Sequence, residues 1–234
     1  MPVTGNKPCD ISVQVGLNGF SYSTDSCARS PWLGAEFVYG CDALQQPHDK
    51  ASLSTMNRKF TLVPSSCFSE EQARYFLSDA VSLDEEDEVL WSLNEAVGAV
   101  EIWAREKGRL VPVVKGMLEK NGGEVEVRPE LHFMLEEGLK LEPYNKIVAS
   151  YAEGTLYLVI FQGKNLLLCN HFDAMEFTTA QYFIFRALKS FQINPETATL
   201  FFRTALSAEE ELALYQYVKE VKALGGAVVS APLA

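Results

Sequence analysis

The sequence predicts an α/β protein, and three observations in its second half carry that prediction. First, residues 146–151, 155–161 and 165–172 read as strands, and Gly-containing turns separate them, so the short loops require antiparallel pairing. Second, the middle strand is apolar on both faces, which implies that helices cover both faces. Third, helices are predicted at 176–190 and 208–224, and strands at 199–202 and 227–230. The element order is therefore β-β-β-α-β-α-β.

The first half opens in the same way. Residues 11–15 and 20–24 alternate in polarity around Asn18-Gly19 and predict a hairpin, with a third strand expected at 35–39. Residues 42–58 are polar and weakly patterned, which is typical of a loop or a poor helix. A strand at 60–63 ends at Pro64. The most economical boundary is Glu142-Pro143, which gives an N-terminal half of residues 1–143 and a C-terminal half of residues 144–234.

Further elements follow between residues 69 and 136. Ser69 and Gln72 have the spacing of a capping box and predict a helix over 70–78. Strands are predicted at 89–93, 99–103 and 124–128, and helices at 110–120 and 129–136. Gly122 fits a helix C-cap. The acidic run of residues 84–88 is interpreted as a solvated loop, because adjacent carboxylates cannot all converge on one cation.

Composition limits the classes of partner. Hydrophobic residues make up 47% of the 234 residues, which is ample for a core, and 31 acidic residues against 20 basic ones give a net charge of −11. Nucleic acids and anionic membranes require a basic surface, so neither partner is expected. The N-terminus lacks an apolar signal region, and the longest apolar run is too short to span a bilayer. We expect a cytoplasmic protein without membrane insertion.

The five cysteines predict no metal site and no disulfide framework. Their number is odd and no C-x-x-C spacing occurs, so free thiols in a reducing compartment are the simplest interpretation. Cys169 and His171 would share one face of a strand and could in principle form a thiolate–imidazole pair. No neighbouring residue offers an oxyanion hole or an orienting carboxylate for such a pair.

Two phrases carry a family resemblance, FTLVPSSCFSEEQARYFLS and LYLVIFQGKNLLLCNHF. They resemble an uncharacterised bacterial family, a domain of unknown function with an actin-like fold. The duplicated element order is similar to that of the actin-like ATPase superfamily, in which each half is ribonuclease-H-like. Its small bacterial members include the type IV pilus assembly scaffold and the cell-division protein that tethers filaments. The resemblance covers nearly the whole chain and implies two such halves.

The resemblance also implies three nucleotide-binding features, and this chain departs from each. The first hairpin of the superfamily carries Asp-x-Gly, whereas Gln14-Val15-Gly16 stands here, so the magnesium-binding carboxylate is a neutral amide. The second Asp-x-Gly corresponds to Ser150-Tyr151-Ala152, with Glu153-Gly154-Thr155 following. The adenosine-binding Gly-Gly corresponds to Phe202-Arg203-Thr204. Gly225-Gly226 is interpreted instead as the end of the helix that Ser207 and Glu210 open.

With these features lost, we expect no catalytic residues, no metal, no cofactor and no enzymatic activity, since phosphoryl transfer depends on a metal and positioned donors. The favoured hypothesis is a degenerate actin-like module, a pseudo-ATPase, that acts as a scaffold for an unidentified protein partner. The alternative is a weak nucleotide or small-anion binder. Its binding residues would be Gln14, Gly16, Asn18, Ser21, Glu153, Gly154 and Thr155. Ribonuclease activity is not expected, because it needs convergent acids around two metals and Asp10 and Asp25 only flank the first hairpin. A sugar kinase would need Asp173 or Asp79 as its catalytic base, and no motif surrounds either residue.

Overall fold

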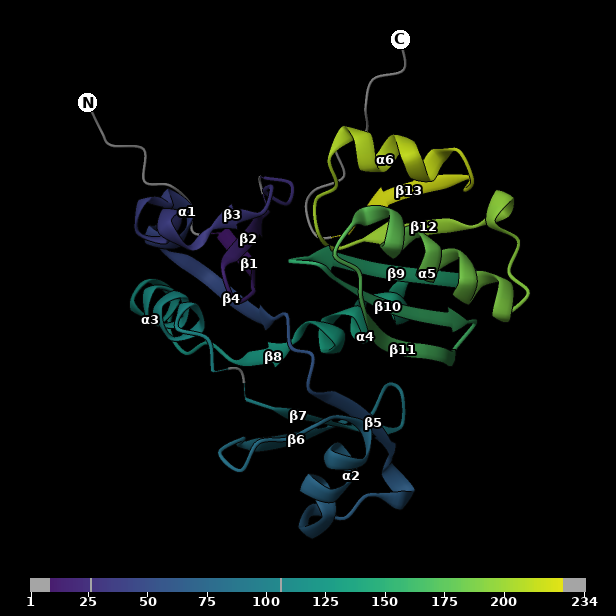
Figure 1. Cartoon of the computed structure of the whole chain (residues 1–234). Coiled ribbons are helices and arrows are strands. Elements are labelled where there is room, and N and C mark those ends of the chain that lie inside the picture. Colours follow the sequence, from purple (N-terminus) through teal and green to yellow (C-terminus); the bar gives the residue numbers. More distant parts are fainter. Residues whose placement is uncertain (1–8, 26, 106, 225–234) are drawn as a thin grey trace.

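The computed structural model describes residues 9–25, 27–105 and 107–224 and contains two five-stranded sheets and one three-stranded sheet (Figure 1). The strand orders of the larger sheets are β3-β2-β1-β4-β8 and β11-β10-β9-β12-β13. In each of them an antiparallel meander is extended by parallel strands next to its first strand. The two sheets therefore repeat one topology, and the predicted fold class is confirmed.

The second large sheet matches its prediction most closely. Its meander consists of β9 (Asn145–Ala152), β10 (Thr155–Gln162) and β11 (Asn165–Asp173). Helix α5 (Phe177–Ser190) packs on the face that carries Leu156, Leu158 and Ile160. Helix α4 (Glu130–Lys140) packs on the face that carries Tyr157, Val159 and Phe161. Both faces of β10 are covered by helices, as its apolar pattern requires.

The end of the chain differs from its prediction. Strand β12 (Thr199–Phe202) is as expected, but helix α6 stops at Tyr215 (Ala208–Tyr215) instead of reaching residue 224. The last strand is β13 (Glu220–Ala223), which pairs in parallel with β12. Val221 lies opposite Leu200 and is buried, so tertiary pairing overrides the helical pattern of this segment. The predicted strand at 227–230 and Gly225-Gly226 lie outside the described residues.

The first large sheet contains a strand that the sequence pattern hides. Strands β1 (Cys9–Val15) and β2 (Gly19–Thr24) form the predicted hairpin, but the third strand, β3, is Leu33–Gly34. Residues 35–40 form a 3₁₀ turn, so the strand predicted at 35–39 is wrong. Residues 42–58, interpreted as loop or poor helix, contain helix α1 (Asp42–Gln45) and strand β4 (His48–Thr55). Strand β4 pairs in parallel with β1 at the centre of the sheet.

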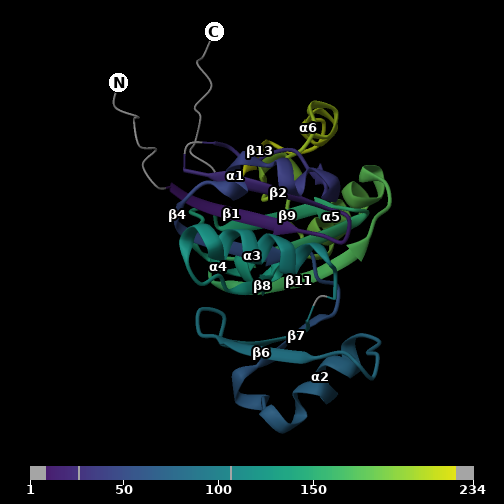
Figure 2. The same ribbon diagram turned by 90° about the vertical axis from the view of Figure 1, so that its left-hand side faces the viewer.

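The three-stranded sheet is inserted between β4 and helix α3 and lies apart from the two larger sheets (Figure 2). Its strands are β5 (Phe60–Pro64), β6 (Val89–Asn94) and β7 (Ala99–Ala104), in the order β5-β7-β6. Helix α2 (Ala73–Ala80) covers one of its faces. The capping box predicted at Ser69 is absent, because residues 70–72 form a 3₁₀ turn before α2 begins.

The acidic run is not simply solvated. Asp87 is buried and pairs with Lys59 and Lys107, while the other four residues of the run are exposed. Hydrogen bonds from Lys59, from the Asp84 amide and from Lys107 hold the pKa of Asp87 well below its ordinary value. Asp87 therefore anchors this loop to the segment after β7 and to the segment after β4.

Helix α4 lies between the two large sheets, as Figure 1 shows. Helix α3 (Leu110–Gly122) packs on the outer face of the first sheet, and its C-cap is Gly123, one residue after the predicted cap at Gly122. Strand β8 (Val127–Pro129) is shorter than the predicted strand and leads directly into α4. The boundary predicted at Glu142-Pro143 falls between α4 and β9, and the division into two halves stays a prediction. No helix in the described part of the chain is long and apolar enough to cross a membrane.

Candidate functional site

A buried hydrogen-bond network joins the two large sheets at the two positions where the resemblance leads us to expect acids. Gln14 on β1 donates to Glu130 Oε1 (2.6 Å) and to Ser150 Oγ on β9 (3.4 Å). Ser150 Oγ also donates to Glu130 Oε1 (2.9 Å), and Ser21 donates to Gln14 Oε1 (2.8 Å). All four residues are essentially inaccessible to solvent. Neutral hydrogen-bonding side chains therefore occupy both positions and contact each other through Glu130.

The charge of Glu130 is balanced from the second sheet. Arg203 follows β12, and its Nη1 lies 2.7 Å from Glu130 Oε2, while its Nε lies 2.9 Å from Glu137 Oε2. Burial works against the charged guanidinium, but the carboxylates of Glu130 and Glu137 outweigh it, so the pKa of Arg203 is raised. The guanidinium also lies 5.2 Å from the ring centre of Phe133. Arg203 thus ties β12 to α4.

A second arginine lies near the same cluster. Arg29 is buried and its Nη2 lies 3.2 Å from Ser12 Oγ on β1. Burial and the nearby charge of Arg203 lower the pKa of Arg29 to about 10, although Glu130 and Glu137 oppose this shift. Two arginines and two glutamates therefore balance in formal charge at the junction of the sheets.

The position expected to contact adenosine is filled by side chains. Phe202, Arg203 and Thr204 are all buried. Thr204 Oγ1 accepts a hydrogen bond from the Tyr151 amide (2.8 Å), and the Arg203 amide donates to the Ala149 carbonyl (2.9 Å). These three residues are therefore part of the packing between β9 and β12.

The turn between β1 and β2 holds a carboxylate from the other sheet. The Leu17 amide donates to Glu153 Oε2 (2.8 Å), and the Asn18 amide donates to Glu153 Oε1 (2.8 Å). Trp32 Nε1 lies 3.4 Å from Glu153 Oε1. The two hairpin turns of the repeated topology thus meet, one as the donor of backbone N–H groups and the other as the acceptor.

The structure divides the seven predicted binding residues into three groups. Gly16, Asn18 and Glu153 meet at the turn, while Gln14 and Ser21 point into the buried network. Gly154 accepts the Ala174 amide, and the Thr155 hydroxyl accepts from Arg58. Their role in binding an anion stays a prediction.

Sequence reasoning missed Glu130 as the centre of the network. Glu130 and Glu137 are seven residues apart and share a face of α4, but the predicted helix ends at residue 136 and does not include Glu137. Of the two bases that a sugar kinase would need, Asp79 lies in helix α2 and Asp173 ends strand β11, where it pairs with Arg58 (3.1 Å). Burial raises the pKa of the Cys169 thiol, which disfavours a thiolate beside His171. Among the described residues, no three His, Cys, Asp or Glu side chains form a cluster that could hold a metal ion.

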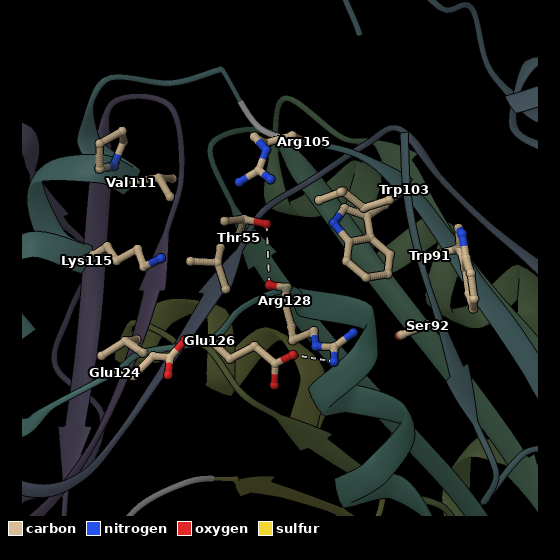
Figure 3. A pocket seen from close by; sticks show the side chains of 14 residues that line it. Thr55, Trp91, Ser92, Trp103, Arg105, Val111, Lys115, Glu124, Glu126 and Arg128 are labelled. Atoms are coloured by element: carbon tan, nitrogen blue, oxygen red, sulfur yellow. Dashed lines mark hydrogen bonds and ion pairs between the residues drawn. The ribbon is translucent and has the colours of Figure 1, made fainter. Parts of the chain in front are cut away.

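A large groove lies elsewhere, between the three-stranded sheet and the first large sheet (Figure 3). Its volume is about 840 Å³. Strand β6 contributes Leu90, Trp91 and Ser92, and β7 contributes Trp103. The opposite wall consists of Val111, Pro112 and Lys115 of α3 and residues 124–128 around β8.

Charges of both signs surround an apolar floor in this groove. Arg128 pairs with Glu126, and its guanidinium lies 5.5 Å from the ring centre of Trp103 (Figure 3). Lys115 and Arg105 reach toward the cavity from different walls (Figure 3). Trp91 is 40% exposed. An apolar floor with tryptophan and arginine and a charged rim is typical of protein-binding surfaces.

Comparisons with known proteins identify the family and the fold. A protein of unknown function from Bacteroides thetaiotaomicron with an actin-like ATPase fold is 18% identical, with a TM-score of 0.64, covering 96% of this chain and 94% of that one. A chain of the PilM–PilN type IV pilus biogenesis complex is 14% identical in sequence, with a TM-score of 0.51. The match covers 91% of this chain and 87% of that chain. No curated protein matches the sequence. The fold of the chain is similar to the actin-like ATPase fold. The family model "Protein of unknown function (DUF3822)" matches residues 35–221, and the chain therefore belongs to the DUF3822 family.

Proposed function

We propose that this protein is a non-catalytic interaction module of the cytoplasm that holds an extended segment of a partner protein in the groove between β6 and β8. The single observation that carries the proposal is the position of these strands. Each is the last strand of its sheet and so has one unpaired edge, and residues of both line the groove. An unpaired edge offers backbone N–H and C=O groups to an extended peptide.

The composition of the groove supports a peptide more than a small molecule. Leu90 and Trp103 provide apolar surface, and charged side chains of both signs line the rim. An extended partner segment with alternating apolar and charged side chains would match this pattern. The complex of PilM with PilN provides an example of a similar fold in a protein–protein assembly, which favours a scaffold role.

The buried network supports the absence of catalysis. Gln14 and Ser150 stand at the positions where ATPases of this superfamily carry acids, and both are hydrogen-bonded to Glu130. Arg203 neutralises Glu130, so the pair offers little attraction to a divalent cation. We therefore expect no hydrolysis of ATP above the level of a blank when magnesium is present.

A photo-crosslinking amino acid at Ser92 tests the proposal in the source cell, and the same group at Ser190, at the end of α5, is the matched control. A defined protein should crosslink at position 92 and not at position 190. With that protein purified, Ser92→Trp should fill the groove and weaken binding roughly tenfold, about 1.4 kcal/mol, whereas Ser190→Trp should leave it unchanged. Equal crosslinking at both positions, or turnover of ATP, would contradict the proposal.

The alternative function is weak binding of a nucleotide or small anion at the turn whose Leu17 and Asn18 amides hold the Glu153 carboxylate, and it requires the anion to displace that carboxylate. Calorimetry with ATP and magnesium separates the two functions. A dissociation constant below about 1 mM, near −4 kcal/mol, would favour the alternative.

A further inference from the structure

We infer that the turn formed by Gly16, Leu17 and Asn18 is an oxyanion site whose resident ligand is the Glu153 carboxylate, and that this carboxylate excludes phosphate-bearing ligands. The inference goes beyond the proposed function, because the turn and the groove share no residue. An experiment that refutes the oxyanion site would therefore leave the proposed peptide groove untouched, and the reverse also holds.

The contact between the Glu153 carboxylate and the turn has the geometry of a bound oxyanion. Each oxygen of one carboxylate accepts a different backbone N–H at 2.8 Å, and Trp32 Nε1 approaches one of them at 3.4 Å. Successive backbone N–H groups that point into a turn are the arrangement with which proteins bind phosphate. Hydrogen bonds from an N–H to a charged oxygen are stronger than those between neutral groups. The turn therefore binds a negative charge, and the chain supplies that charge itself.

The close approach depends on glycine. A Cβ atom at Gly16 would lie 2.5 Å from Glu153 Oε2, and one at Gly19 would lie 2.3 Å from Trp32 Nε1. Both distances are far below van der Waals contact, so a side chain at either position would displace the group beside it. The first hairpin is therefore shaped to admit the carboxylate and the indole.

The backbone at Glu153 is also unusual. Glu153 has φ of 49° and Gly154 has φ of 70°, so the two residues form a turn with both central residues left-handed. Asn-Gly is the preferred sequence for such a turn, whereas glutamate is disfavoured in this conformation. The strained position aims the carboxylate at the other sheet, which is consistent with a selected contact.

Occupation by Glu153 excludes phosphate for two reasons. A phosphate oxygen would need the same two N–H groups, which already donate to the carboxylate. Phosphate would also meet the negative charge of Glu153 within a few ångströms. The carboxylate thus acts as a latch between the two large sheets and closes the anion site.

The test removes the carboxylate without disturbing the turn. Glu153→Asn introduces the preferred Asn-Gly pair, so the hairpin should fold at least as well. The matched control is Glu95→Asn in the exposed turn between β6 and β7, which removes the same charge. The amides of Leu17 and Asn18 in the Glu153 variant should exchange with solvent roughly tenfold faster than in the natural protein, while the control should not differ.

Titration with inorganic phosphate, followed by the NMR shifts of these two amides, tests the exclusion. Phosphate at millimolar concentration should shift them in Glu153→Asn and leave them unchanged in the natural protein and the control. Gly16→Ala is a second variant, because its Cβ would expel the carboxylate while Glu153 remains. Its two amides should also exchange faster. Unchanged exchange in both variants, phosphate binding to the natural protein, or freed amides that take no phosphate would each overturn the inference.

Discussion

Replacing Arg203 with methionine should destabilise the protein strongly. The Arg203 side chain is 1% exposed and that of Glu130 is 0% exposed, so the variant leaves a carboxylate buried without its counter-charge. Removal of one partner from a buried ion pair typically costs about 3–5 kcal/mol. For a chain of this size each kcal/mol corresponds to about 2–4 °C, so the melting temperature should fall by roughly 6–20 °C.

A double-mutant cycle shows whether the uncompensated charge is the cause. Glu130→Gln keeps an oxygen that can accept from Gln14 and Ser150, and it removes the negative charge. Arg203→Met combined with Glu130→Gln should therefore be more stable than Arg203→Met alone. Thermal and urea unfolding of the four proteins measure the coupling free energy. A loss of less than about 1 kcal/mol in the free energy of unfolding of Arg203→Met would refute this reasoning. A double variant whose loss equals the sum of the two single-variant losses would refute it as well.

Three further predictions concern stability. Gly138→Ala should cost about 1–3 kcal/mol, because the new Cβ would lie 2.8 Å from the Phe161 ring, whereas Gly116→Ala in an open helical position should stabilise by about 0.4–1 kcal/mol. Ser207→Ala should lower the free energy of unfolding by about 1 kcal/mol, because the Ser207 hydroxyl caps α6 by accepting from the Glu210 amide. Urea unfolding measures this loss, and Gly116→Ala is the reference variant. Burial lowers the pKa of His48, so the unfolded chain binds the proton more readily; stability is full above the ordinary pKa of 6.5 and falls as pH drops through the lower folded value. Melting temperatures between pH 7.5 and 5 should show this decline, and His48→Leu should reduce it.

The sequence predicts those elements whose local pattern matches their tertiary surroundings. Strand β10 is apolar on both faces because helices cover both, and the two-residue turn before it fixes its pairing. Strand β4 fails this test. Its sequence, HDKASLST, has one large apolar residue, Leu53, yet it pairs along most of β1. Its Ser54 and Thr55 are buried because their hydroxyls donate to backbone carbonyls, which a hydrophobic pattern cannot reveal.

The candidate site was harder to predict, because its contacts join distant parts of the chain. Gln14 meets Glu130 across 116 residues and Leu17 meets Glu153 across 136. Comparison with the superfamily locates Gln14, Ser150 and Arg203, since their motifs have fixed places in the element order. It does not indicate that Glu130 lies between them, because Glu130 belongs to no such motif.

These contacts indicate how a ligand-binding junction can become a structural one. An acid at position 14 or 150 would meet Glu130 at hydrogen-bond distance, and two buried like charges would repel unless a cation lay between them. Glutamine and serine instead donate to Glu130, while Arg203 supplies the positive charge from within the chain. At the turn, Glu153 supplies the negative charge in the same way. Both charges that a magnesium–phosphate complex would bring are then provided by side chains, which supports a junction held closed without a ligand.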